Sequence, residues 1–278
     1  MKESLQELFP DNRESGATKL RQSQLVMIRI LRIFDYLSKK YEFKYWLEWG
    51  TLLGAVRHKG FIPWDSDIDL GILRSDFEKF VKEAADELPN DIFLQTPQTD
   101  PFFCTWDKYK YVSKLKDKYS CYHEWALKHP ERTHHNGLQI DLFIHENLSR
   151  SEFKAKLKNR SYWFIRRIIK DPYGFIPALP YLFTKESLFP LKHLEFEGTL
   201  FPVPKKYHKY LTFYYGNYME LPPVEQRVSP EGAAEPFIPC KHNEILFWNE
   251  QSRIEWAKMW NDEKVCRGQE HDAVIEFT

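Results

Sequence analysis

The sequence predicts an α+β fold, because segments with helical periodicity and segments with strand periodicity alternate along the chain. Leu20 to Tyr41 has apolar residues at helical spacing between basic and amide residues, which is typical of a packing helix. Tyr45 to Leu73 then combines an aromatic strand, a glycine turn, a short helix and an acidic strand. Further strands are expected at Ile92 to Thr96, Lys108 to Lys116 and Leu138 to His145.

The segment from Tyr45 to Val56 predicts an anion site. Tyr45 to Trp49 has the character of a strand, Gly50 permits a tight turn, and Thr51 is a good N-cap for the helix that follows. The N–H groups and the dipole at such a helix start attract anions. We therefore expect Gly50 and Thr51 to contact a phosphate group.

The acidic segment from Ile62 to Leu73 predicts a metal site. Carboxylates and a glycine alternate there with apolar residues: Asp67, Asp69 and Gly71 with Ile68, Leu70 and Ile72. On a half-buried strand, both carboxylates leave the same face about 6–7 Å apart and repel each other unless a cation lies between them. We expect Asp67 and Asp69 to ligate one or two Mg²⁺ ions that also bridge phosphate oxygens. Anion site and metal site together indicate phosphoryl or nucleotidyl transfer.

Three other interpretations of this acidic run compete with a metal site. Asp65, Asp67 and Asp69 imitate the start of an EF-hand loop, but Leu70 stands where that loop needs glycine. The Asp-x-Asp motif of metal-dependent glycosyltransferases usually follows a whole nucleotide-binding region, whereas only one helix and one strand precede it here. An exposed acidic turn would not require strict apolar alternation.

Two cations are candidates for binding the phosphates. The strand from Lys108 to Lys116 carries lysines along one face, so that Lys114 reaches the phosphates with Lys116 behind it, or the face is a solvated edge. Arg57 lies at the end of the short helix, where a phosphate contact and a structural interaction with the helix dipole are equally consistent with the sequence.

Asp141 interrupts the apolar strand from Leu138 to His145. A lone carboxylate in such a strand is unfavourable unless it is paired, metal-bound or at the mouth of a cleft. We expect it to be the third acid of the site, as a general base or as a ligand of a second metal. His134 and His135 precede it in a polar turn and are interpreted as solvated loop residues.

The segments that follow the acidic strand predict helices and a cover for the core. A helix is expected after the acidic strand with Ser75 as its N-cap. Ser151 to Lys170 predicts a basic aromatic helix, which either faces the core or makes peripheral contact with the inner face of a membrane. Phe196 to Pro223 predicts a strand, a turn and a helix that ends at Gly216, forming one wall of a cleft.

Composition limits the function classes. The 278 residues are consistent with a polar segment at 1–18 and one catalytic domain at 19–278, with its core at 40–225 and a helical tail at 240–278. Forty basic and forty acidic residues balance, which argues against nucleic-acid binding. No long apolar run or signal sequence occurs, so a cytoplasmic protein is expected. The four cysteines are far apart and predict reduced thiols rather than a zinc site.

Three blocks of the sequence resemble the LicD phosphocholine transferases and their fukutin-related relatives, within the nucleotidyltransferase superfamily. The blocks are Gly50 to Arg57 with Phe61 to Asp69, then Gln139 to Phe143, and then Phe201 to Pro204 with Tyr215, Gly216 and Leu221 to Pro223. Ser66 stands where the family commonly has an aspartate, and the cysteine-bound zinc insertion of fukutin-related members is not reproduced. The resemblance implies a nucleotidyltransferase-like short mixed β-sheet flanked by helices, with additional helices around the core.

The resemblance also implies a reaction. A phospho-alcohol group, such as phosphocholine, moves from a CDP-linked donor to a hydroxyl of a cell-surface glycan or its lipid-linked precursor, and CMP is released. The alternatives are transfer of the nucleotide itself with release of pyrophosphate, and a silent member that only binds nucleotides. The predicted site comprises Asp67, Asp69 and Asp141 as catalytic residues, the first two also as metal ligands, with Gly50, Thr51, Arg57 and Lys114 around the donor.

Overall fold

A computed structural model describes residues 4–96, 98–100, 103, 112–122, 135–145, 148, 183–227 and 234–239. The predicted helix at 151–170, the tail at 240–278 and the first half of the lysine-bearing strand lie outside these residues. In the described part of the chain, no helix has the length and apolar character needed to cross a membrane.

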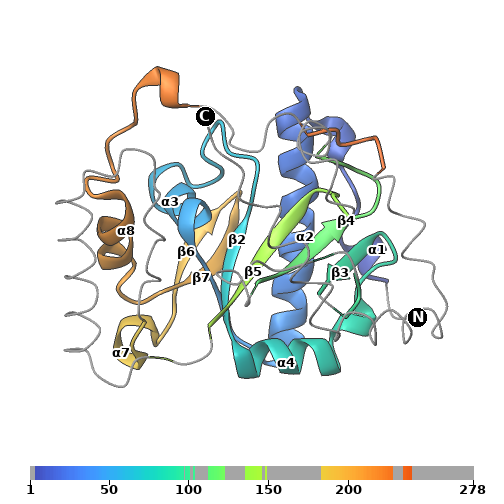
Figure 1. The fold of residues 1–278 in the computed structure, drawn as a ribbon, viewed down its shortest axis with the longest axis horizontal. Helices are drawn as coiled ribbons and strands as arrows, with labels where there is room; N and C mark the ends of the chain where they lie inside the picture. The colour runs from blue at the N-terminus through green and yellow to red at the C-terminus, as the bar shows by residue number, and fades with distance from the viewer. Residues whose placement is uncertain are drawn as a thin grey trace, which may run out of the picture.

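The centre of the fold is a five-stranded mixed sheet with the order β1-β2-β5-β4-β3 (Figure 1). Its strands are β1 (Tyr45–Leu47), β2 (Asp69–Leu73), β3 (Ile92–Gln95), β4 (Val112–Asp117) and β5 (Gln139–His145). The β2 and β5 strands are parallel, and the other neighbours are antiparallel. With helices packed on this sheet, the predicted α+β fold with a short mixed sheet is confirmed.

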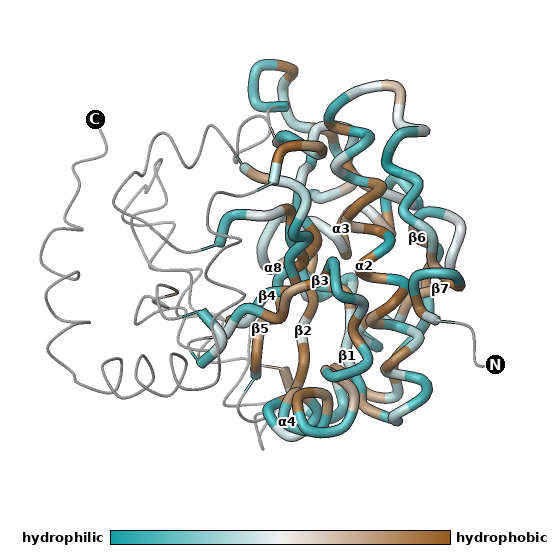
Figure 2. The backbone as a smooth tube through the Cα atoms, turned by 90° about the vertical axis from the view of Figure 1, so that its right-hand side faces the viewer, coloured by the Kyte–Doolittle hydropathy of each residue, from teal (hydrophilic) through white to brown (hydrophobic). Residues whose placement is uncertain are grey.

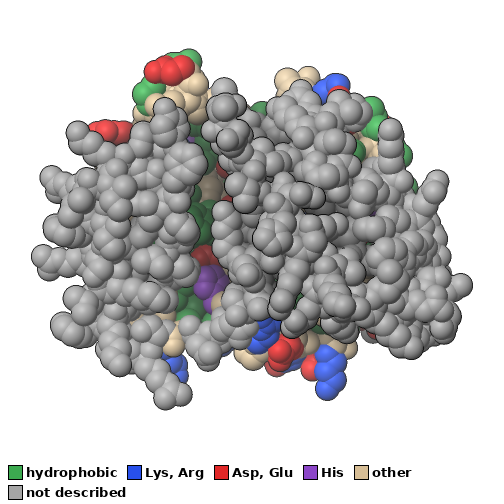
Figure 3. All heavy atoms as spheres, viewed as in Figure 1, with side chains coloured by type: hydrophobic (Ala, Val, Ile, Leu, Met, Phe, Trp, Pro, Cys, Tyr) green, Lys and Arg blue, Asp and Glu red, His purple; other side chains and the backbone are tan. Residues whose placement is uncertain are grey.

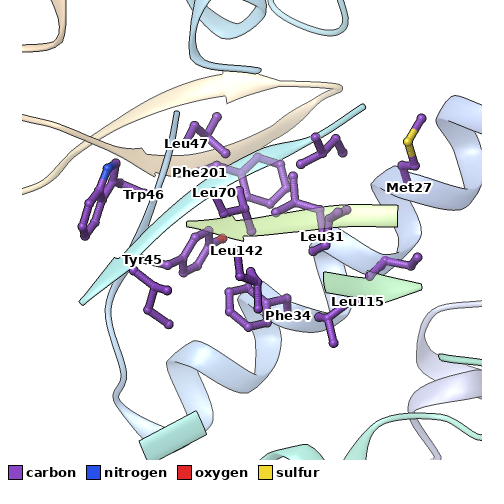
Figure 4. Packing of buried hydrophobic residues seen from close by; sticks show 14 of the residues in the cluster. Met27, Leu31, Phe34, Tyr45, Trp46, Leu47, Leu70, Leu115, Leu142 and Phe201 are labelled. Atoms are coloured by element: carbon purple, nitrogen blue, oxygen red, sulfur yellow. The ribbon is translucent and has the colours of Figure 1, made fainter. Parts of the chain in front are cut away.

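Two helices cover one face of the sheet. The long α2 (Lys19–Tyr41) crosses it and contacts β4 and β5, while α4 (Arg74–Glu83) packs against β2 and β5 (Figures 1 and 2). The apolar partners that the acidic run predicts, Ile68, Leu70 and Ile72, are fully buried in this core. Figure 4 shows Tyr45 beside Phe34 of α2 and Leu47 beside Phe201, whereas Trp46 points the other way, as alternation along β1 requires.

A second unit packs beside β1. It is the hairpin of β6 (Lys192–Phe196) and β7 (Thr199–Val203), which contacts β1 and α3 (Trp49–Arg57). The following α8 (Tyr207–Tyr215) contacts α3 and ends at Gly216, whose φ of 62° is left-handed, so the predicted helix stop is confirmed. The shorter helices are α1 (Leu5–Leu8), α7 (Lys185–Leu188) and the 3-10 turns Arg13–Ser15, Ala85–Glu87 and Val224–Gln226.

Several predicted boundaries are wrong. The alternation predicts a strand from Asp67, but the strand begins at Asp69, because residues 61–68 form a loop. The helix after it begins at Arg74 with Leu73 as N-cap, so Ser75 does not cap it. The block from Phe196 contributes to a two-stranded hairpin rather than a single strand, because Glu197, with a φ of 51°, and Gly198 reverse the chain.

The N-terminal segment is more than a polar extension. Arg13 is buried and donates to both carboxylate oxygens of Asp117 at the end of β4, at 2.7 and 3.1 Å. Bidentate pairing of this kind fixes both position and orientation. The contact joins residues far apart in sequence, so local patterns carry no signal for it.

Candidate active site

A row of polar side chains crosses the middle of the sheet on the face opposite α2. Asp69 pairs with Asp141, Asp141 with Lys114, and Lys114 with Gln95. The backbone N–H of Glu48 donates to the carbonyl of Asp69 at 3.0 Å, which extends the row past β2. Residues paired across neighbouring strands project from the same face. The fold therefore brings together two of the three predicted acids and the predicted lysine.

Lys114 binds Asp141 directly. Its Nζ donates to Oδ1 and Oδ2 of Asp141, both at 2.8 Å. The alternative that the lysine face of β4 is a solvated edge is wrong, because β4 lies between β5 and β3 and Lys116 is only 2% exposed. Contact between Lys114 and a donor phosphate stays a prediction.

Asp67 lies just before β2 and belongs to the same acidic group as Asp141. Burial raises the pKa of Asp67 most, and the negative charge of Asp141 raises it further, while a hydrogen bond with Asp65 and the charge of Lys114 act in the opposite direction. The carboxylates of Asp67 and Asp141 are thus close enough to repel each other. A bound cation would relieve this repulsion.

The loop at 61–68 is fixed from three sides. The Gln24 side chain on α2 donates to the carbonyl of Asp65 at 3.0 Å, and the Tyr122 hydroxyl donates to the carbonyl of Ser66 at 2.8 Å. The side chain of Glu197, at the tip of the β6–β7 hairpin, accepts from the N–H of the first loop residue at 3.2 Å. These contacts position the carboxylates although the segment has no regular secondary structure.

The helix start differs from the prediction at Thr51. The N-cap of α3 is Glu48, so Thr51 lies inside the first turn and is not the cap. Its hydroxyl accepts from the backbone N–H of Asp69 at 2.8 Å. Thr51 therefore ties the start of α3 to the start of the acidic strand, which brings the predicted anion site next to the predicted metal site.

The left-handed residue at the start of α3 is Trp49, its first residue, and not Gly50. Trp49 has a left-handed φ of 43°, which is rare for a bulky residue. A glycine at position 50 is explained by packing, because a Cβ there would lie 2.9 Å from Oδ2 of Asp65. The glycine thus gives the Asp65 carboxylate room to approach the helix start.

Arg57 has a structural contact. Its Nη1 donates to the carbonyls of Tyr218 and Glu220, at 2.9 and 3.1 Å, and burial lowers its pKa. It therefore fastens the segment after α8 to the end of α3. This contact agrees with the structural alternative for Arg57, and its contact with the donor remains untested.

A partly buried pair beside the acids, Glu48 and His145, is absent from the predicted site. An oxygen of Glu48 lies 3.0 Å from Nε2 of His145, and the rings of Trp46 and Phe183 pack on His145. Gly71 makes room for this arrangement, since a Cβ there would lie 2.3 Å from the indole of Trp46. A signal existed: His145 is four residues after Asp141 on the same strand, so strand periodicity puts both on one face.

The end of α8 faces the acids. The pKa of the Tyr215 phenol is raised above its ordinary range. Burial of the phenol is the largest cause, although 39% of the residue's surface is exposed, and the negative charges of Asp69, Asp65 and Asp67 raise the pKa further. Figure 3 shows acidic, histidine and hydrophobic side chains near the middle of this side of the molecule. That the block ending at Pro223 forms one wall of a cleft stays a prediction.

His135 is not a solvated loop residue. It is 1% exposed, its Nδ1 accepts from the N–H of Gly137 at 3.2 Å, and its own N–H donates to Asp100 at 3.0 Å. The interpretation is therefore wrong for His135, and His134 lies outside the described residues. The buried free thiol at Cys121 is consistent with the expected reduced cysteines.

The donor atoms fit a magnesium ion that binds together with a diphosphate. Within the described ranges, no three or more histidine, cysteine or acidic side chains are grouped so as to hold a metal ion. Mg²⁺ does not need such a cage, because it is usually bound through one or two carboxylates, substrate phosphates and water. Asp67 and Asp69 supply suitable oxygen atoms. Metal binding itself stays a prediction.

Comparison with known proteins identifies the family. The model of the LicD/FKTN/FKRP nucleotidyltransferase domain matches residues 42–206. The chain is 33% identical to the lipopolysaccharide cholinephosphotransferase LicD of Haemophilus influenzae, over 79% of this chain and 98% of that protein. It is also 64% identical over 33 residues to the human ribitol 5-phosphate transferase FKRP, which covers 12% of this chain and 7% of that protein. The chain belongs to the LicD/FKTN/FKRP family.

Proposed function

We propose that this protein is a Mg²⁺-dependent transferase that moves a phospho-alcohol group from a CDP-linked donor to a sugar hydroxyl of a cell-surface glycan or its lipid-linked precursor. The names of a cholinephosphotransferase and a ribitol 5-phosphate transferase among its relatives support this class of reaction. The observation that carries the proposal is the position of Asp67, Asp69 and Asp141 beside the start of α3.

In the proposed reaction, the acceptor oxygen attacks the β-phosphorus of the donor, which carries the alcohol. The new P–O bond forms while the bond from that phosphorus to the bridging oxygen breaks, and CMP leaves with the bridging oxygen. Asp141 accepts the proton of the sugar hydroxyl, and Lys114 orients the Asp141 carboxylate through its contacts with both oxygens. Bound Mg²⁺ would neutralise the diphosphate charge.

The start of α3 supports a diphosphate at this position. Backbone N–H groups of a first helical turn favour an anion, and Gly50 and Thr51 lie in this turn. Thr51 also holds the backbone of Asp69, so the phosphate and metal subsites are linked by one hydrogen bond. We propose Asp67 and Asp69 as the metal ligands and Lys114 as a further phosphate contact.

The test is to supply CDP-choline or CDP-ribitol, labelled on each phosphate in turn, with a sugar acceptor and Mg²⁺. The proposal expects CMP release and transfer of the β-phosphate label to the sugar, both lost in excess chelator. A nucleotidylated sugar, or pyrophosphate released from a nucleoside triphosphate without CMP release, would favour nucleotidyl transfer instead. Nucleotide binding without turnover of any donor would indicate a silent member.

A further inference from the structure

Three partly exposed aromatic side chains form a cluster beside the acids. The ring of Trp49 lies 4.2 Å from that of Tyr214 and 6.2 Å from that of Phe143, centroid to centroid. They come from the start of α3, from α8 and from β5. Phe143 is two residues after Asp141 on the same face of β5, a separation of about 6–7 Å. We call these three residues the aromatic cluster.

The position of the Trp49 ring is fixed by its surroundings. Its left-handed backbone is unfavourable for a large side chain, and such conformations persist where the surrounding structure enforces them, often at ligand clamps. The N–H of Trp49 donates to the hydroxyl of Tyr210 at 3.3 Å. Tyr210 is fully buried and packs against Tyr214 with centroids 4.9 Å apart. The cluster therefore stands on a buried aromatic support.

The surroundings of the cluster are negatively charged. The charges of Asp69, Asp65, Asp67 and Glu48 all act on Tyr215, the residue next to Tyr214. Lys114, the cation in the polar row, is paired with Asp141. A positively charged group near the cluster would be attracted by these carboxylates.

We propose that the aromatic cluster binds a quaternary ammonium group, the trimethylammonium end of a choline-type donor alcohol. The faces of aromatic rings attract such cations, and choline is recognised in this way by aromatic cages. A polyol such as ribitol would need hydrogen-bond partners along its length, which ring faces do not provide. The inference rests on the proposed function and names the alcohol that Trp49, Phe143 and Tyr214 select.

The decisive reagent is a neutral isostere of choline, 3,3-dimethylbutanol, which has the same shape without the charge. For wild-type protein, kcat/KM with CDP-choline should exceed that with CDP-3,3-dimethylbutanol. Loss of one ring, in Trp49→Leu, Phe143→Leu or Tyr214→Leu, should lower this ratio by about 2- to 30-fold, the range of a cation–π contact. Trp49→Phe, which keeps a ring, should retain most of the preference.

The control is Phe93→Leu. Phe93 is a similarly half-buried ring on the same face of the sheet, at the β3 edge, where it packs on His135. Its loss should leave the ratio unchanged, and thermal unfolding checks that each variant is folded. Folded ring variants that keep the wild-type ratio, or a wild-type ratio near one, would overturn the assignment.

A binding experiment tests the aromatic cluster independently of the proposed reaction. If no donor is turned over, the proposed function fails, and calorimetry with phosphocholine against 3,3-dimethylbutyl phosphate still tests the cluster. Preference for phosphocholine that falls in Tyr214→Leu supports the cluster, and equal binding rejects it. Phosphatidylcholine vesicles test whether the ammonium group belongs to a lipid: vesicle binding that depends on the cluster, without preference among soluble ligands, would reject the donor assignment.

Discussion

Replacing Asp141 by asparagine should separate the chemical role of its carboxylate from its structural one. The change removes the ion pair with Lys114, and Lys114→Met removes the same pair from the other side. The two side chains are 19% and 16% exposed, so the pair lies between exposed pairs, which contribute about 0–1 kcal/mol, and buried pairs, whose disruption costs about 3–5 kcal/mol. Each variant should therefore lose about 1–3 kcal/mol of unfolding free energy.

The kinetic effects of the two variants should differ. If Asp141 is the general base, Asp141→Asn lowers kcat by about 10²- to 10⁴-fold with little change in the KM for the donor. Lys114→Met keeps the carboxylate but removes the contacts that orient it, so kcat should fall less than in Asp141→Asn, and the donor KM should rise if Lys114 also contacts the phosphates. Steady-state CMP release gives both constants, and urea unfolding gives the stability. An Asp141→Asn protein that binds donor poorly but has a normal kcat at saturation would refute the assignment.

Three further predictions follow from single contacts. Asp67→Asn should nearly abolish turnover. Because the native pKa of Asp67 is raised, the native state holds its proton more tightly than the unfolded state, and stability falls as pH rises through the window above its ordinary 3.8. In the absence of metal, the Asp67→Asn protein should therefore resist urea better than metal-free wild type at pH 7, and the two should be equally stable at low pH. Equal stability of the two proteins at both pH values would contradict this. Gly71→Ala should destabilise the protein by about 1–3 kcal/mol through overlap with Trp46, and an unchanged urea midpoint would show that the indole can move away. Arg13→Met leaves the Asp117 carboxylate, whose side chain is 1% exposed, without its ion-pair partner Arg13 and should lower the free energy of unfolding by about 3–5 kcal/mol. Lys40→Met breaks the surface pair with Glu87 and should change the free energy of unfolding little. Similar effects of the two changes would show that the Arg13 pair contributes no more than a surface pair.

Periodicity in the sequence predicted the buried face of the central strand and the acids beside it. Apolar alternation identified the buried face of β2, and a carboxylate inside an apolar strand identified Asp141. The parallel pairing of β2 with β5 then places Asp69 beside Asp141, a contact between residues far apart in the chain. Residue types indicated which groups belong to the site, and pairing of distant strands determined their geometry.

The errors have local causes. Thr51 and Gly50 are good turn and cap residues, but tertiary contacts override these propensities: Trp49 is the left-handed residue, and the Thr51 hydroxyl holds β2 instead of capping α3. Arg57 and His135 have partners that are distant in sequence, so their interactions could not be predicted from their own segments. The Glu48–His145 pair could have been predicted. A carboxylate next to an apolar strand needs a partner, and this holds for Glu48 after β1 as it does for Asp141 in β5.

The apolar face of the sheet explains why the acids hold their positions. Ile68, Leu70 and Ile72 are fully buried against the helices on the other side, so a shift of β2 by one residue would bury the carboxylates and expose the core. The free energy that fixes this register comes from burial of the apolar face. The pairing of β2 with β5 thus sets the separation of Asp69 and Asp141, so a metal and a diphosphate would enter a site that needs little reorganisation.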